Sequence, residues 1–326
     1  MTTAMLLTNR VVATLLLAWA STAPPLHAAW PEKPVRVIVP FAPGGTADIL
    51  ARTISSKLNP VLGQAVVVEN RAGAAGNIGT ELVAKAKPDG YTLLVNLMNP
   101  HVVNPALYRN MPFNGVEDFT PIAMLAAVIS TMAIHPSVPA KNVKEFIAVV
   151  RARPGQIAYA SAGTGSSTHL NAAVFEKMAD IRMLHVPYKG GAPAVLDTMT
   201  GQAQMIITAA TQTLPHVKTG RLRLLGVTRA KRAAMLPDVP AIAETLPGYE
   251  AVVWFGTFGP AGLPQDITAR LNSEINKLMS APDTKSVMEN MGVEVLTLTP
   301  EAFQKKLRDE AAHWRSVVQK YGIKAE

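Results

Sequence analysis

Short runs of β-branched and aliphatic residues alternate with helix-like segments along most of the chain, and this alternation constrains the fold more than any other feature. The first run, Val35–Val39, ends at Pro40 and opens into a glycine-bearing loop. A helical pattern follows, which we expect to stop at Asn59 and Pro60. This β-α-β-α-β order predicts a mostly parallel sheet covered by helices on both faces. The next expected elements are a strand at 66–68, a helix at 78–86 and a strand at 91–95.

A second set of alternating elements follows, which predicts a second α/β lobe. Loops at the carboxyl ends of strands are where open α/β sheets bind ligands. If the lobes face each other, a ligand lies between helix N-termini, whose N–H groups and dipoles favour an anion. We expect lobe 1 at 30–130 with the segment 255–326 packing back onto it, and lobe 2 at 131–254. The expected helices are 141–151, one through Phe175, 192–199, 214–219, 267–279 and 301–321, and the expected strands are 157–160, 183–186, 205–208 and 222–227.

The composition narrows the chemistry open to the chain. Cysteine is absent, which removes thiolate catalysis and thiolate metal sites. The 7 histidines show no paired metal-ligand spacing, and Gly73, Gly76 and Gly79 depart from the G-x-G-x-x-G pattern of dinucleotide loops. We therefore expect neither a metal nor a cofactor. The net charge of +8 favours anionic partners, but the basic residues are dispersed, so nucleic-acid binding is not expected; a monomer is the expected state.

Residues 1–29 differ from everything after them. One basic residue, Arg10, and no acid precede an apolar run at 11–20, and residues 21–29 are small and broken by prolines. This pattern predicts a secretory signal peptide, because the apolar run is too short to span a bilayer. Ala28 and Ala29 are alternative cleavage points.

The loop 40–48 has two interpretations. Gly44 and Gly45 would let the backbone approach a ligand and Thr46 would donate a hydroxyl, which together describe an anion cradle. Equally, the glycines make a turn and Asp48 caps the helix. The loop lacks the Gly-Lys-Ser/Thr of a P-loop, so a nucleoside triphosphate is not expected.

The loop 161–169 also has two interpretations. A secreted hydrolase would use Ser166 or Ser167 as nucleophile and His169 as base, but there is no G-x-S-x-G elbow and neighbouring positions on one helix give poor hydroxyl-to-imidazole geometry. The simpler interpretation is that the hydroxyls and backbone amides bind a carboxylate. We therefore expect a binding protein and not an enzyme.

Read in order, these loops and several further motifs resemble the Bug family, the substrate-binding proteins of tripartite tricarboxylate transporters. The resemblance covers nearly the whole chain after residue 30. It implies an α/β, two-lobed periplasmic binding protein fold of type II-like topology, with an interlobe cleft that closes on an organic carboxylate. It also implies a periplasmic location and membrane subunits of the transporter as partners. The matching stretches are 39–48 with Ala51 and Arg52, 69–76 with Ile78 and Gly79, 87–94, 165–170, 185–190 and 236–240.

The resemblance also implies which residues contact the ligand, some of them through ordered waters. The first-lobe contacts are Phe41, Ala42, Gly44, Gly45, Thr46 and Asp48, and the second-lobe contacts are Thr164, Gly165, Ser166, Ser167 and Thr168.

The chain departs from the family pattern at 204–211, where relatives commonly carry acidic or amide residues. With Thr208 there, a ligand ammonium would lack a counter-charge, and burying an unpaired charge is costly. We therefore expect a di- or tricarboxylate without an amino group. Phe41, Met98 and the small Ala209 and Ala210 leave room for a flat ring such as that of terephthalate. A ligand-sensing adaptor for a signalling receptor shares this mechanism and stays an alternative.

Overall fold

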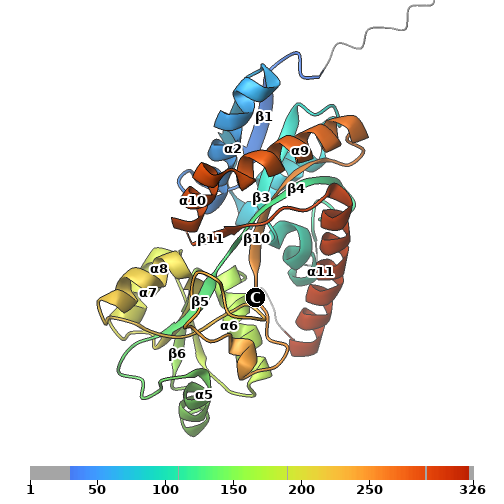
Figure 1. Cartoon of the computed structure of the whole chain (residues 1–326). Helices are drawn as coiled ribbons and strands as arrows, with labels where there is room; N and C mark the ends of the chain where they lie inside the picture. Colours follow the sequence, from blue (N-terminus) through green and yellow to red (C-terminus); the bar gives the residue numbers. More distant parts are fainter. Residues whose placement is uncertain (1–29, 109, 189, 291, 323–326) are drawn as a thin grey trace, which may run out of the picture.

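Two β-sheets with helices on their faces make up the molecule (Figure 1). The computed structural model describes residues 30–108, 110–188, 190–290 and 292–322, so the predicted signal peptide lies outside the described residues. The first sheet has the strand order β11-β4-β10-β3-β1-β2. Its strands are β1 (Val35–Val39), β2 (Val66–Asn70), β3 (Thr92–Leu97), β4 (Phe119–Val128), β10 (Val253–Pro260) and β11 (Val293–Val295).

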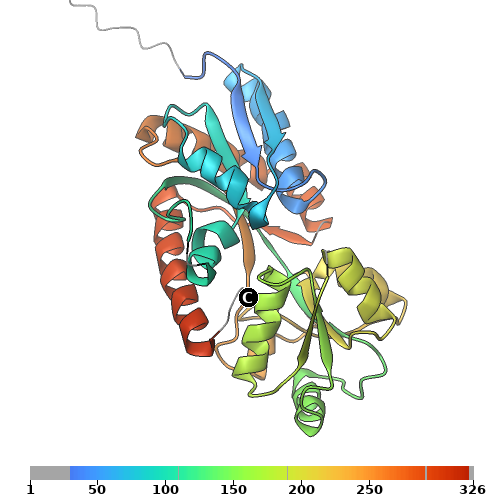
Figure 2. The ribbon, with the colours of Figure 1, turned by 180° about the vertical axis from the view of Figure 1, so that it is seen from behind.

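Helices cover both faces of this first sheet. They are α2 (Thr46–Leu62), α3 (Asn77–Ala84), α9 (Gln265–Ser280), α10 (Pro282–Asn290) and α11 (Pro300–Tyr321), with a π-turn at Asn99–Val103 followed by α4 (Asn104–Leu107). Figures 1 and 2 show the two helical layers from opposite sides. Strand β1 alternates accordingly, since Val37 and Val39 pack into the cluster under α2 and α9 while Ile38 packs into the cluster under α3 and α11.

The second sheet has the order β7-β6-β8-β5-β9 and comes from the middle of the chain. Its strands are β5 (Ser130–Ile134), β6 (Ala158–Ser161), β7 (Leu184–Pro187), β8 (Met205–Ala209) and β9 (Arg223–Val227). Its helices are α5 (Val143–Ala152), α6 (Ser167–Met178), α7 (Gly191–Met199) and α8 (Ala210–Lys218).

Both sheets are mixed, which corrects our expectation of mostly parallel sheets. β1 pairs in parallel with β2 and β3, and β6 pairs in parallel with β7 and β8, as the alternating pattern predicts. However, β10 is antiparallel to β3 and β4, and β5 is antiparallel to β8 and β9. These antiparallel strands adjoin the places where the chain passes between the sheets, so a helical crossover does not set their direction.

Two segments carry the chain between the sheets. On the way out only Ile129 separates β4 from β5; its N–H donates to Gly292 O (3.1 Å) and its carbonyl accepts from Ala210 N (2.7 Å). On the way back the chain enters β10 at Val253. Trp254 is fully buried there, and its Nε1 donates to Glu310 Oε2 at 2.7 Å. In Figure 1 β10 points from the second sheet into the first, with α11 along one side.

Helix α2 runs through Asn59 and Pro60, where we expected it to end. Pro60 lies in the last turn, and the helix instead stops at Gly63, which adopts a left-handed φ of 68°. Asn59 Oδ1 accepts a hydrogen bond from Val66 N (2.7 Å) and so ties the helix end to β2.

The pattern that predicted the C-terminal helix is confirmed. Phe303, Leu307, Trp314 and Val318 are all buried on one side of α11, and Phe303 packs edge-on against Trp254. Among the described residues, no helix combines the length and apolar character that a membrane span requires.

Candidate ligand-binding cleft

A pocket of about 220 Å³ lies where strand ends from the two sheets meet. We call it the cleft pocket. β3 and β8 end at it with Leu97 and Ala209, so it lies at the carboxyl ends of strands in both sheets. Its walls are Leu97, Val128, Val253 and Phe255 from the first sheet, and Ser130, Ala162, Ser167, Thr168, Asn171, Gly191, Ile207, Thr208, Ala209 and Gln212 from the second sheet and its helices.

Three helices begin at the cleft pocket. α6 starts at Ser167, α7 starts at Gly191, and α8 starts at Ala210 directly after the lining residue Ala209. The first N–H groups of a helix have no partner within that helix, and the helix dipole places partial positive charge at the same end. Ala210 N–H already donates to Ile129 O and His169 N–H to Ser166 Oγ, so the donors offered to an anion are the other N–H groups in the first turns of these helices.

The cleft pocket carries no formal charge of its own. Among the described residues that line it there is no Asp, Glu, Lys or Arg. A bound carboxylate would therefore be stabilised by N–H and hydroxyl donors, and a ligand ammonium would find no carboxylate to offset its desolvation. The Thr208 hydroxyl donates to Gln212 Oε1 (2.6 Å), so two lining side chains orient each other.

The loop before α6 is held by its own hydroxyls. Ser166 Oγ donates to Gly163 O (2.6 Å) and accepts from His169 N (3.3 Å), which makes Ser166 the N-cap of α6. Thr168 Oγ1 accepts from Ala162 N at 2.7 Å. Ser167 makes no such bond among the described residues and lines the pocket, so its hydroxyl is free to meet a ligand.

Behind this loop lies an aromatic stack that the sequence pattern did not predict. The His169 and His185 rings stack with centroids 4.2 Å apart, and Tyr159 stacks on His185 at 4.9 Å. Burial lowers the pKa of His169 to about 4, so this ring is neutral at pH 7. Because His185 comes from β7 and His169 from α6, no local motif signals the stack.

The stack also bears on the hydrolase alternative. His169 Nδ1 accepts from Gly165 N (3.1 Å), and no bond joins its ring to Ser166 or Ser167 in the described structure. The one hydroxyl bonded to an imidazole in this region is Ser161, at 2.7 Å from His185 Nε2, and Ser161 is fully buried. A substrate could not reach that pair.

The first-lobe loop is organised around Asp48. Its carboxylate accepts from Gly44 N (3.0 Å), Arg52 Nε (2.9 Å) and Asn70 Nδ2 (2.9 Å), and Asn70 also donates to Phe41 O (3.0 Å). The hydrogen bond from Arg52 is the main reason that the pKa of Asp48 falls to about 2. Asp48 is thus buried and shapes the loop, and its expected contact with the ligand stays a prediction.

The remaining expected contacts fall into three groups. The cleft pocket brings together Ser167, Thr168, Thr208 and Ala209. Ser166 holds the loop, and Met98 lines a different cavity, described below. The rest do not line the cleft pocket in this structure; they are Phe41, Ala42, Gly44, Gly45, Thr46, Thr164 and Gly165.

Comparisons with known proteins decide the family. The model of the TctC family, described as the tripartite tricarboxylate transporter family receptor, matches residues 50–323. The chain belongs to the TctC family. It is 34% identical to protein BugT of Bordetella pertussis over 313 residues, which cover 95% of this chain and 96% of BugT. The resemblance to Bug proteins is therefore confirmed.

Two solved structures of similar proteins contain ligands. Rpa4515 of R. palustris with adipate has 34% sequence identity and a TM-score of 0.80, covering 90% of this chain and 99% of that one. MatC of Rhodopseudomonas palustris with bound malate has 29% identity and a TM-score of 0.76, covering 89% of this chain and 100% of that one. The structure of the periplasmic binding protein BugD has 34% identity and a TM-score of 0.77, covering 90% of this chain and 99% of that one, which confirms the periplasmic binding protein fold. The TctC family is one of transporter receptors rather than enzymes.

Proposed function

We propose that this TctC receptor captures a small organic di- or tricarboxylate without an amino group and delivers it to the membrane subunits of a tripartite tricarboxylate transporter. The observation that carries the proposal is the uncharged cleft pocket at the start of three helices. Such a site compensates a carboxylate through N–H groups and leaves an ammonium without a partner. Adipate and malate, named for the two similar structures, are both dicarboxylates.

The apolar walls extend the proposal to aromatic ligands such as terephthalate. Leu97, Val128, Val253 and Phe255 offer hydrocarbon surface opposite the helix starts. A flat ring could lie against these side chains while its carboxylates face the donors. Linear diacids would fit the same pocket, so the affinities for linear and aromatic diacids have to be compared by measurement.

Lobe closure completes the proposed site. The loop 41–48 is exposed at Ala42, Gly44 and Gly45, and it precedes a helix of 17 residues, α2. We infer that the lobes divide at residues 130 and 254 and that they close on the ligand. Closure would bring the loop 41–48 into contact with the second carboxylate of the ligand. Export by the leader at 1–29 would place the protein in the periplasm.

Isothermal titration calorimetry tests the proposal. The panel is adipate, malate, citrate, terephthalate, aspartate and glutamate. We expect saturable binding of at least one of the first four and none of the two amino acids.

Ser167→Ala should weaken binding about tenfold, because a hydrogen bond to a charged group is lost. Ser273→Ala, on the exposed side of α9, is the matched control. Tight binding of aspartate or glutamate with no binding of the four acids would refute the proposal.

A further inference from the structure

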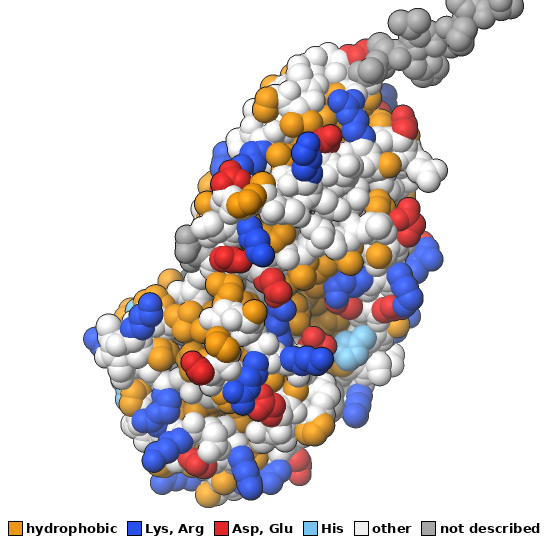
Figure 3. All heavy atoms as spheres, in the orientation of Figure 1, with side chains coloured by type: hydrophobic (Ala, Val, Ile, Leu, Met, Phe, Trp, Pro, Cys, Tyr) orange, Lys and Arg blue, Asp and Glu red, His pale blue; other side chains and the backbone are white. Residues whose placement is uncertain are grey.

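A second cavity of about 420 Å³ lies between α11 and the segment that leads into β10. We call it the hinge-side cavity. Figure 3 shows it as a hollow with hydrophobic side chains at its base and charged side chains around its rim. The base is formed by Met98, Met124, Val252 and Leu296, with Trp314 at one side.

The hinge-side cavity and the cleft pocket lie on opposite faces of the same strands. Val253 and Phe255 line the cleft pocket, whereas Val252 lines the hinge-side cavity. Likewise, Leu97 lines the cleft pocket and Met98 lines the hinge-side cavity. No described residue lines both spaces, so we treat them as two sites, although a third space of about 10 Å³ is lined by residues of each.

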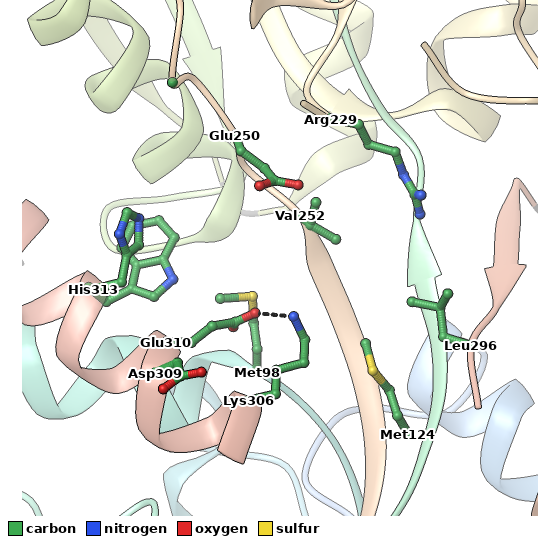
Figure 4. Close-up of a pocket in the computed structure, with 12 residues that line it drawn as sticks. Met98, Met124, Arg229, Glu250, Val252, Leu296, Lys306, Asp309, Glu310 and His313 are labelled. Atoms are coloured by element: carbon green, nitrogen blue, oxygen red, sulfur yellow. Dashed lines mark ion pairs between the residues drawn. The ribbon is translucent and has the colours of Figure 1, made fainter. Parts of the chain in front are cut away.

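Most charges around the hinge-side cavity already have partners. Lys306 pairs with Glu310 at 2.5 Å, as the dashed line in Figure 4 marks, and Glu310 also accepts from Trp254 Nε1. Asp309 pairs with Lys305 at 2.6 Å. The charges within these pairs neutralise each other, so Arg229 and Glu250 remain to be considered.

Arg229 and Glu250 are incompletely paired. Arg229 Nη1 bonds Glu294 Oε2 at 2.5 Å, but its Nε and Nη2 are buried and have no partner. An unpaired buried donor destabilises the molecule, and the Nε and Nη2 edge of a guanidinium matches the two oxygens of a carboxylate. Among the described residues nothing bonds the exposed Glu250 carboxylate, which points into the same space from the opposite wall (Figure 4).

We propose that the hinge-side cavity binds an α-amino acid with an apolar side chain. The ligand carboxylate lies on Arg229, its ammonium lies on Glu250, and its side chain packs on Met98, Met124 and Leu296. Arg229 lines the cavity with 20% of its side-chain surface exposed, but its Nε and Nη2 are covered, so binding requires the guanidinium to turn toward the ligand. The pairs Lys305–Asp309, Lys306–Glu310 and Arg229–Glu294 cancel in charge, so Glu250 leaves this cavity with one net negative charge; a dicarboxylate is disfavoured and the two sites differ in ligand class.

Calorimetry with leucine and methionine tests the site on the whole protein. We expect saturable binding of both. N-acetylleucine, which lacks the ammonium, and leucinamide, which lacks the carboxylate, should each bind at least tenfold more weakly. Glu250→Gln should weaken leucine binding at least tenfold and leave N-acetylleucine unchanged, and Arg229→Gln should weaken leucine to a similar degree.

The controls remove the same charges elsewhere. Glu81→Gln and Arg36→Gln each break an exposed ion pair away from the cavity and should change leucine affinity less than twofold. If Arg229→Gln lowers the melting temperature, weaker binding by that variant could come from instability. The test then depends on Glu250→Gln alone, because Glu250 is exposed. The proposal is overturned if leucine and methionine give no saturable heat, or if Glu250→Gln leaves their affinity unchanged. It is also overturned if Ser167→Leu in the cleft pocket abolishes leucine binding.

Discussion

Asp48 accepts hydrogen bonds from Gly44, Arg52 and Asn70 and holds the loop 41–48 in place. We expect Asp48→Asn to lower the free energy of unfolding by about 1–3 kcal/mol, because buried donors lose a charged acceptor. Ligand affinity should fall with it, since the loop would no longer be preorganised. Urea denaturation and calorimetry measure the two effects. Asp266→Asn is the control at an exposed position, and equal behaviour of the two variants would contradict the role of Asp48.

Two buried histidines predict acid sensitivity. Burial lowers the pKa of His101 and of His169 from 6.5 to about 4. Between these values the unfolded chain binds protons that the folded chain cannot bind, so stability is retained above pH 6.5 and falls as the pH drops toward 4. Each residue contributes up to about 3 kcal/mol to this loss.

Urea denaturation at pH 7, 5.5 and 4.5 measures the acid sensitivity. We expect His169→Gln to reduce the dependence of stability on pH. An identical pH dependence in wild type and His169→Gln would show that this ring does not titrate as we expect.

At this scale some of the polar residues that the sequence suggested line the cleft pocket, whereas Thr46, Thr164 and Ser166 do not. Ser167, Thr168 and Thr208 stand out because hydroxyls beside glycines and strand ends suggest a ligand. Leu97 and Phe255 line the same pocket, but they are large apolar residues of the kind that usually form a core. Only the fold shows that they lie at the pocket.

Among the elements, β10 depends on a glycine where it meets α11. The β10 register shifts between Phe255 and Gly256, and a Cβ at Gly256 would lie 2.4 Å from Phe303 Cζ. We expect Gly256→Ala to destabilise the protein by about 1–3 kcal/mol through overpacking, as a lower melting temperature would show. The double variant Gly256→Ala/Phe303→Leu should recover part of the loss. A double variant that melts below both single variants would contradict this explanation.

Two strands that we did not predict, β4 and β10, share a physical cause. β4 is buried along nearly its whole length and contains Ala123, Ala126 and Ala127, so it shows neither polar alternation nor strong β propensity. β10 contains Gly256, Gly259 and Pro260, which ordinarily end strands. Tertiary pairing in the centre of the first sheet overrides these local preferences.

At the scale of the molecule, Ile129 and the start of β10 are the places where the chain passes between the sheets. Bending at these two places would let the lobes close. We expect small-angle X-ray scattering to show a smaller radius of gyration when the cleft ligand is bound. A radius that stays constant at saturating ligand would mean that the cleft is rigid.

The two-sheet architecture could be predicted because each set of alternating elements carries its own apolar pattern. The way in which the two sets of elements are joined could not be predicted, because it depends on how β4, β5 and β10 pair. Such pairing leaves no local signature in the sequence.

The uncharged cleft pocket lies in a chain whose net charge is +8. Arrival and retention of an anion are therefore governed by different forces. The long-range field of the whole molecule attracts the anion and accelerates its arrival, and dissolved salt screens that field. Once bound, the anion is held by short-range dipoles, so its residence time should be nearly independent of ionic strength. In a compartment whose salinity follows the surroundings, the receptor would capture ligand at a varying rate yet release it at a constant one.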